Sequence, residues 1–262
     1  PSEKAGLLPG DRIVTINDSV FVGKSLTNRV VIDNLKGEKG STVDVGVKRQ
    51  GIEELLDFTI TRDEIPLYSV DVGYMVDDST GYIKISRFAQ TTHKEFLDHA
   101  VKLKEKGMKQ IILDLRLNSG GYLNASTDLA DEFLPKDDLI VYTKGRARRL
   151  KEHYATEQGI LEDLGLIVLI DSWSASASEI VAGAVQDQDR GLIIGQRSFG
   201  KGLVQEPVVF RDGSVVRLTI ARYYTPTGRC IQKSYENGNK AYFHDIEKRL
   251  ERGELESPDS ID

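Results

Sequence analysis

The chain has 262 residues, a formal net charge of -6 at pH 7, and 39% hydrophobic residues. This length and composition are those of a globular protein with a buried core in one or two domains. The acidic balance argues against a nucleic-acid-binding face, and no run approaches the roughly 18 apolar residues of an embedded membrane segment. The single cysteine, Cys230, cannot form an internal disulfide and is expected to pack as a small side chain.

Residues 1–63 are predicted to form a small β-rich domain. An alternating strand is expected over 12–17, a helix from about Ser25 to Leu35, and a hairpin over 42–61. The motif Leu-x-Pro-Gly-Asp-x-Ile-x-x-Ile-Asn, over residues 7–17, resembles the core of a PDZ domain. The segment that supplies the first strand and the carboxylate-binding loop of such a domain is absent, so an N-terminally incomplete PDZ-like domain is expected.

A second domain is expected to begin near Asp63–Pro66 and to extend to residue 232. Short apolar strands alternate with helices in this region, which predicts a layered α/β core whose main strands are buried on both faces. A charged C-terminal helix and tail are expected over residues 233–262, with the helix peripheral. The expected elements are strands at 81–85, 109–115, 166–170 and 192–195, helices at 92–106, 125–133, 176–186 and 242–252, and a hairpin of 208–210 with 215–224.

The junction after the strand at 166–170 carries the sequence Ser174-Ala-Ser176-Ala-Ser178-Glu179. A hydroxyl where a strand gives way to a helix faces unpaired backbone N–H groups and the positive end of the helix dipole, which suits a nucleophile. The same residues also form a capping-box sequence, in which Ser176 and Glu179 satisfy helix N–H groups. This stretch alone favours capping over catalysis, and its spacing does not separate Ser176 from Ser174 and Ser178.

Lys201 lies between two glycines, in a segment that follows the strand at 192–195. A lysine acts as a general base only when burial or a neighbouring positive charge lowers its pKa, so a basic role for Lys201 requires it to be buried. The segment alone favours an exposed loop lysine. A phosphate-binding loop is disfavoured, because the upstream glycine spacing and the Ser or Thr after the lysine are missing.

The sequence Asp114-Leu-Arg116-Leu-Asn-Ser-Gly120-Gly121 follows another strand. Paired glycines expose backbone N–H groups without side-chain obstruction, which suits an oxyanion hole, although a simple tight turn is the commoner origin of such a pair. Asp114 and Arg116 are expected to form a structural ion pair near the end of the strand.

Together, these ordered motifs resemble the carboxyl-terminal processing, or tail-specific, serine proteases. In that family a PDZ domain precedes an α/β protease core related to the ClpP/crotonase folds, here expected over residues 64–232. The motif Phe-Gly-Lys-Gly-x-x-Gln matches residues 199–205. The resemblance implies a nucleophile at Ser176, a base at Lys201, a glutamine that orients the base at Gln205, and an oxyanion hole from the N–H of Gly120 or Gly121 with that of Ala177.

The resemblance also implies acyl-enzyme chemistry without a metal or cofactor. Substrates are expected to be proteins with unfolded, accessible C-terminal tails, and the setting extracytoplasmic, such as the bacterial periplasm or a membrane surface. The sequence leaves open whether the chain forms a homo-oligomer. Two alternatives remain: a peptide-binding scaffold without catalysis, and an acyl-CoA enzyme of the crotonase type, which leaves the Ser and Lys motifs unexplained.

Overall fold

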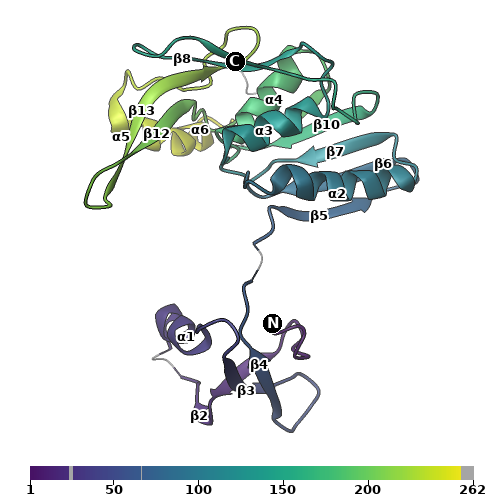
Figure 1. Cartoon of the computed structure of the whole chain (residues 1–262), viewed down its shortest axis with the longest axis vertical. Helices are drawn as coiled ribbons and strands as arrows, with labels where there is room; N and C mark the ends of the chain where they lie inside the picture. Colours follow the sequence, from purple (N-terminus) through teal and green to yellow (C-terminus); the bar gives the residue numbers. More distant parts are fainter. Residues whose placement is uncertain (24–25, 66, 255–262) are drawn as a thin grey trace. The chain divides into compact units, whose positions relative to one another are not determined.

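The computed structural model describes residues 1–23, 26–65 and 67–254. The chain forms two compact units, which divide between Leu67 and Tyr68 (Figure 1). The division lies just beyond the change of pattern near Asp63–Pro66, of which Pro66 itself is outside the described residues.

The N-terminal unit is a four-stranded antiparallel sheet with one helix. The sheet has the order β2-β1-β3-β4, and the buried side of its strands supplies the core. Helix α1 begins at Asn28, where the Thr27 hydroxyl accepts the N–H of Val30 at 3.4 Å. The expected helix start at Ser25 lies outside the described residues. The bounds are β1 Arg12–Ile16, β2 Ser19–Val20, α1 Asn28–Leu35, β3 Thr42–Lys48 and β4 Leu56–Thr61.

The main sheet of the C-terminal unit has five strands in the order β11-β10-β7-β6-β5. Strands β6, β7, β10 and β11 are parallel, and β5 pairs antiparallel with β6 at the edge. The carboxyl ends of β7, β10 and β11 therefore meet at one edge of the sheet, which is where open α/β sheets bind their ligands. The bounds are β5 Val70–Met75, β6 Thr80–Ile85, β7 Gln110–Asp114, β10 Gly165–Ile170 and β11 Leu192–Gly195.

Helices α3 and α4 separate the main sheet from a second sheet of order β12-β13-β8-β9 (Figure 1). Val181 of α4 packs into the core of the main sheet, and Ile180 and Ala184 pack with Ile140 of β8. The predicted layered α/β architecture is confirmed. The remaining bounds are α2 Thr92–Glu105, α3 Leu123–Asp131, β8 Leu139–Lys144, β9 Lys151–Tyr154, α4 Ala177–Asp187, β12 Leu203–Val209 and β13 Val215–Tyr224.

The C-terminal segment differs from the expected single peripheral helix. It forms two short helices, α5 Gly238–Phe243 and α6 Asp245–Glu251, and the expected tail from residue 255 onward lies outside the described residues. The segment is not peripheral, because Arg249 is 1% exposed. The prediction that Cys230 packs as a small side chain is also wrong. This cysteine is exposed, and its backbone forms an antiparallel bridge with Tyr224.

Candidate active site

Ser176 lies at the N-cap of α4, at the turn that follows β10. Its backbone has φ 56° and ψ -111°, a left-handed conformation that costs free energy for a residue with a β-carbon. Ser174 and Ser178 are both 0% exposed, and their hydroxyls donate to the carbonyls of Leu115 and Asn118 at 2.8 and 2.9 Å. Of these three serines, the half-buried Ser176 is therefore the accessible one.

The paired glycines lie against this turn. Gly120 has φ +97°, and a β-carbon placed on it would lie 2.6 Å from both the Ser176 β-carbon and the Ala175 carbonyl oxygen. Asn118 fixes the approach, because its side chain donates to the Ile85 carbonyl at 2.9 Å and its backbone carbonyl accepts the N–H of Ala175 at 3.0 Å. Only a glycine at position 120 allows the two turns to touch.

The backbone N–H groups near Ser176 are not equally available. The N–H of Gly120 donates to the Asn118 side chain at 2.9 Å. Among the described residues, the N–H groups of Gly121 and Ala177 have no protein acceptor. The β-carbon position of Gly120 is 2.9 Å from the Ala177 nitrogen, so the glycine turn directly adjoins this free donor. Two unoccupied donors beside a serine are the elements of an oxyanion hole.

Glu179 connects the Ser176 turn to the loop that carries Lys201. One carboxylate oxygen accepts the N–H groups of Ser176 and Lys201, both at 2.8 Å, and the other accepts the Ser198 hydroxyl at 2.7 Å and the Gly200 N–H at 2.6 Å. The Glu179 residue is 6% exposed. Burial raises the pKa of Glu179, since desolvation outweighs the hydrogen bonds that favour the carboxylate.

The side chains of Lys201 and Gln205 are exposed. The burial that a basic role for Lys201 requires is therefore not met in this structure, because the Lys201 backbone faces Glu179 while its side chain extends into solvent. Across the described ranges, no hydrogen bond joins the Lys201 amine to Ser176 or to Gln205. The structure thus brings Ser176, Ala177 and the glycine pair together, but joins Lys201 to them only through its backbone.

Comparison with known proteins identifies the family of this chain. Residues 79–238, more than half of the chain, match the sequence model of Peptidase family S41. The chain belongs to peptidase family S41.

Relatives of this S41 chain include two bacterial proteins. It is 37% identical over 235 residues to the carboxy-terminal processing protease CtpB of Bacillus subtilis, covering 89% of this chain and 48% of the relative. It is 39% identical over 237 residues to the carboxy-terminal-processing protease of Bartonella bacilliformis, covering 88% of this chain and 54% of the relative. The chain therefore spans about half the length of the curated relatives it matches.

Two solved structures have similar folds. The photosystem II D1 C-terminal processing protease superposes with a TM-score of 0.57 at 32% identity, covering 89% of this chain and 63% of the other. An S41 protease from Bacteroides fragilis gives a TM-score of 0.61 at 17% identity, covering 99% of this chain and 72% of the other, and so supports the fold alone.

The expected ion pair of Asp114 and Arg116 is confirmed at the end of β7 of the S41 core. Asp114 is 0% exposed and accepts two hydrogen bonds from the Arg116 guanidinium, at 2.9 and 2.7 Å, and one from the Tyr82 hydroxyl at 2.6 Å. Burial alone would raise the pKa of Asp114, but the hydrogen bonds from Arg116 and Tyr82 lower it to about 2.

This ion pair predicts a stability loss in acid. Between the unfolded pKa of 3.8 and the folded value of about 2, the unfolded chain binds more protons, so the free energy of unfolding falls as pH drops through that window. The contribution of Asp114 is on the order of 1–2 kcal/mol, fully present above the window. Urea unfolding between pH 2 and 5 should show a shallower pH dependence in Asp114→Asn than in wild type. Asp98→Asn, at an exposed position of α2, is the control, and equal slopes in all three proteins would contradict the assignment.

Gly120→Ala should lower the free energy of unfolding by more than the strain of a positive-φ alanine alone explains. Gly120→Ala introduces both a positive-φ alanine and the 2.6 Å contacts with Ser176 and Ala175. Gly213→Ala, at φ +83° with nothing within 4 Å, introduces the strain alone. We expect Gly120→Ala to be the less stable by about 1–3 kcal/mol. The single tryptophan, Trp173, lies in the Ser176 turn, so its fluorescence can follow urea unfolding at the site. Equal losses in the two variants would rule out the close approach.

In the described ranges 1–23, 26–65 and 67–254, no helix combines the length and apolar character that crossing a membrane requires. The same residues contain no group of three or more His, Cys, Asp or Glu side chains placed to hold a metal ion.

Two residues of the site, Glu179 and Asn118, were not identified by sequence reasoning as connecting residues. Glu179 was assigned only a capping function, and the structure adds its contacts with the Lys201 loop. Asn118 lies within the motif that ends in the paired glycines, where its buried amide holds the turn. A polar residue inside a motif was the available sequence signal for both, but the Glu179 contacts with the Lys201 loop and the Asn118 contact with Ile85 join residues that are distant in sequence.

Proposed function

We propose that this chain is a serine-type peptidase in which Ser176 is the nucleophile and Lys201 the general base. The observation that supports this most strongly is the Ser176 turn. An accessible serine with a strained backbone stands beside free N–H groups of Gly121 and Ala177, at the carboxyl edge of a parallel sheet. Strained nucleophiles at strand-to-helix turns, paired with backbone donors, are typical of acyl transfer.

The reaction begins when the neutral Lys201 amine takes the proton of the Ser176 hydroxyl. The hydroxyl oxygen attacks the peptide carbonyl, and the N–H groups of Gly121 and Ala177 donate to the developing oxyanion. Collapse of this intermediate breaks the peptide C–N bond, the amine leaves with the proton from Lys201, and water then hydrolyses the ester. In the proposed active form, the Lys201 side chain rotates from the exposed position of this structure to a buried one beside Ser176, and Gln205 orients its amine.

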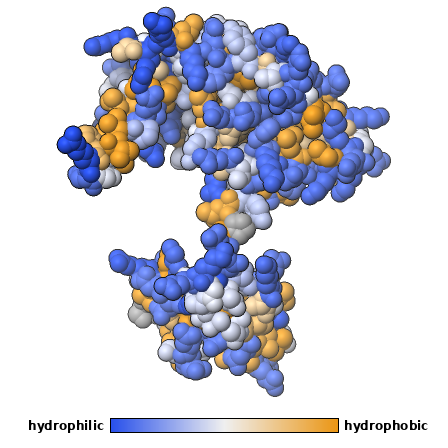
Figure 2. All heavy atoms as spheres, viewed as in Figure 1, coloured by the Kyte–Doolittle hydropathy of each residue, from blue (hydrophilic) through white to orange (hydrophobic). Residues whose placement is uncertain are grey.

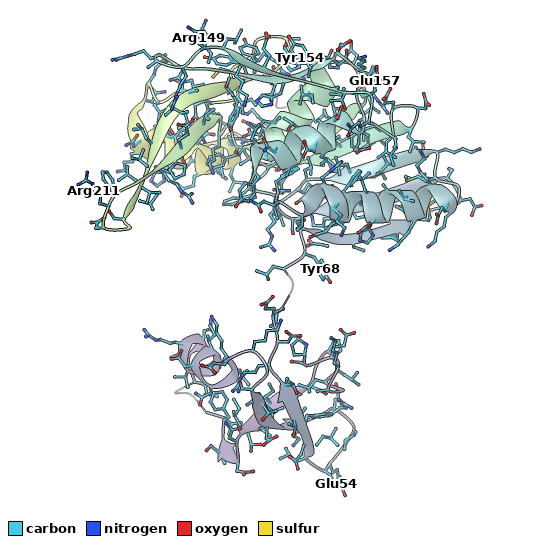
Figure 3. All side chains as sticks on the ribbon, viewed as in Figure 1. Glu54, Tyr68, Arg149, Tyr154, Glu157 and Arg211 are labelled. Atoms are coloured by element: carbon cyan, nitrogen blue, oxygen red, sulfur yellow. The ribbon has the colours of Figure 1, made fainter. Side chains whose placement is uncertain are left out.

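The hairpin that follows the base loop supports an extended substrate. Strand β12 is at the edge of its sheet, and no other described strand pairs with its outer side. The hairpin exposes large apolar side chains, and Arg211 lies at its far end (Figures 2 and 3). An edge strand with exposed apolar residues suits an added peptide strand. These side chains are Val208, Val209, Phe210, Val215, Val216 and Leu218.

The N-terminal unit, which ends at Leu67 and contains the PDZ-like region of residues 1–63, would bind the substrate tail. It contains a cavity of about 620 Å³ next to α1, lined in part by Val31, Leu35, Val43 and Ile60. This lining suits apolar side chains at the end of an unfolded chain. The Bacillus subtilis and Bartonella bacilliformis relatives are both named carboxy-terminal processing proteases, which supports tails as the substrate class.

An extracytoplasmic location is part of the proposal. The proposed setting is the bacterial periplasm or a membrane surface, and the relatives that are named carboxy-terminal processing proteases are bacterial. Sedimentation velocity of the active protein would measure whether it is a homo-oligomer.

Tail-dependent cleavage tests this function. Two unfolded substrates of identical sequence, except for an apolar or a highly charged C-terminal tail, should be compared. The apolar tail should be cleaved about tenfold faster at limiting concentration, since one well-placed apolar contact is worth about 1–3 kcal/mol. Val31→Glu, at the cavity, should remove the difference and leave cleavage of a short peptide unchanged. Failure to cleave either substrate would leave a binding scaffold, and saturable coenzyme A binding would favour an acyl-CoA enzyme.

A further inference from the structure

Arg249 is the largest fully buried side chain in the described part of the chain, at 1% exposure. Arginine is almost never fully buried unless it is paired, because loss of water around a charge is costly. Its Nε donates to Glu254 at 2.7 Å, and its terminal nitrogens donate to the carbonyls of Arg197 and Ser198 at 2.5 and 3.3 Å. Each nitrogen of the guanidinium thus has an acceptor.

The two carbonyls belong to the loop that carries Lys201. Arg249 holds this loop at its start, through Arg197 and Ser198, while Glu179 holds its end, through the N–H groups of Gly200 and Lys201. The buried Arg249 guanidinium therefore donates to the loop carbonyls, and the buried Glu179 carboxylate accepts from the loop N–H groups. Charge-assisted hydrogen bonds of this kind are about twice as strong as neutral ones, so both ends of the loop are fixed.

Glu254 completes the arrangement from beyond α6. It is paired with both Arg249 and Arg197, and its side chain is 10% exposed. Burial opposes its charge, but the hydrogen bond from Arg197 and the charge of Arg249 lower the pKa of Glu254 below its usual range. Residues 249 and 254 lie outside the range 79–238 that matches the S41 sequence model. This ion pair therefore belongs to the segment that follows the matched range.

We infer that Arg249 is a positioning residue for the base: by holding the carbonyls of Arg197 and Ser198, it fixes the backbone from which Lys201 reaches Ser176. The inference rests on the proposed roles of Ser176 and Lys201. Arg249 itself touches neither side chain, and it acts by limiting the positions that the Lys201 amine samples. Loss of this restraint should reduce the rate of the chemical step more than the affinity for substrate.

The test is the kinetics of Arg249→Met and Arg249→Lys on a short fluorogenic peptide. Displacement of a catalytic group by about 1 Å costs about 100-fold, so kcat of Arg249→Met should fall by about that factor with KM within about twofold of wild type. Arg249→Lys keeps the charge and can donate to one carbonyl, but it lacks the planar fork, so we expect it to recover about tenfold of the loss. The rate at which a fluorophosphonate labels Ser176 should also fall, and it should fall more in Arg249→Met than in Arg249→Lys.

Two control variants separate positioning from stability. Leu250→Ala changes the exposed neighbour of Arg249 and should match wild type in kcat. Leu103→Ala removes a buried side chain of α2 and should lower the thermal midpoint without lowering kcat at temperatures where it remains folded. Wild-type kcat in a folded Arg249→Met would overturn the inference, as would a kcat loss in Leu103→Ala equal to that in Arg249→Met. Wild type that neither cleaves the peptide nor reacts with the probe would instead overturn the proposed function.

Discussion

Ser176→Ala should reduce peptide hydrolysis by about five to six orders of magnitude, the loss measured when the serine of a comparable catalytic group is removed. The substitution keeps the β-carbon and deletes only the hydroxyl. The Glu179 carboxylate bonds to the backbone N–H of Ser176, so the turn is held without the hydroxyl. The free energy of unfolding should therefore stay within about 0.5 kcal/mol of wild type. Initial rates of variant and wild type, compared at equal protein concentration, give the measurement.

Other substitutions at the same turn check that the loss is chemical. Ser176→Gly removes the hydroxyl and also relieves the strain of φ 56°, so it should be inactive but more stable by about 1 kcal/mol. Ser178→Ala deletes a buried hydroxyl that donates to the Asn118 carbonyl, so it should lose about 1 kcal/mol of stability and keep most activity. Full activity in Ser176→Ala would move the nucleophile to another residue.

Lys201→Met should reduce hydrolysis by about 10²–10⁴-fold, the range that a general base contributes. The Lys201 side chain is exposed and its backbone N–H keeps its hydrogen bond to Glu179, so the fold should be unchanged. Urea unfolding followed by Trp173 fluorescence should confirm equal stability while the kinetic assay reports the loss.

Two further variants identify the function that Lys201 supplies. Lys201→Arg keeps the positive charge but cannot supply a neutral amine, so it should be as inactive as Lys201→Met. Residues that act as one unit are non-additive, so the double variant of Ser176→Ala with Lys201→Met should be no slower than Ser176→Ala alone. An active Lys201→Arg would show that Lys201 acts only as a charge.

The main elements of the fold could be predicted because their apolar patterns are local. The apolar run at 192–195 predicts the observed bounds of β11, and the observed α4 begins and ends one residue later than predicted. Strand β9 was not predicted, because its sequence, Lys-Glu-His-Tyr, is polar and it is ordered by pairing with β8. The C-terminal segment was misjudged for a related reason. Its charged composition suggests a solvent-facing helix, but the charge of Arg249 is buried against carbonyls that are distant in sequence.

The site could be predicted only in part. Each motif follows a strand, and the parallel order of β7, β10 and β11 brings the three strand ends to one edge. Sequence spacing could not choose among the serines, whereas burial of Ser174 and Ser178 separates them from Ser176. Nor could it assign the Gly120 N–H, which is occupied by Asn118. The orientation of the Lys201 side chain depends on rotamer freedom at an exposed position, which no sequence pattern encodes.

The position of a covalent adduct tests the central claim most directly. Wild-type protein should be treated with a fluorophosphonate, digested, and mapped by mass spectrometry. We predict one modified residue, Ser176, with a modification rate that falls at least about 100-fold in Lys201→Met because the base no longer activates the hydroxyl. An adduct on Ser174 or Ser178, or a rate at Ser176 that does not depend on Lys201, would contradict the proposed catalytic pair.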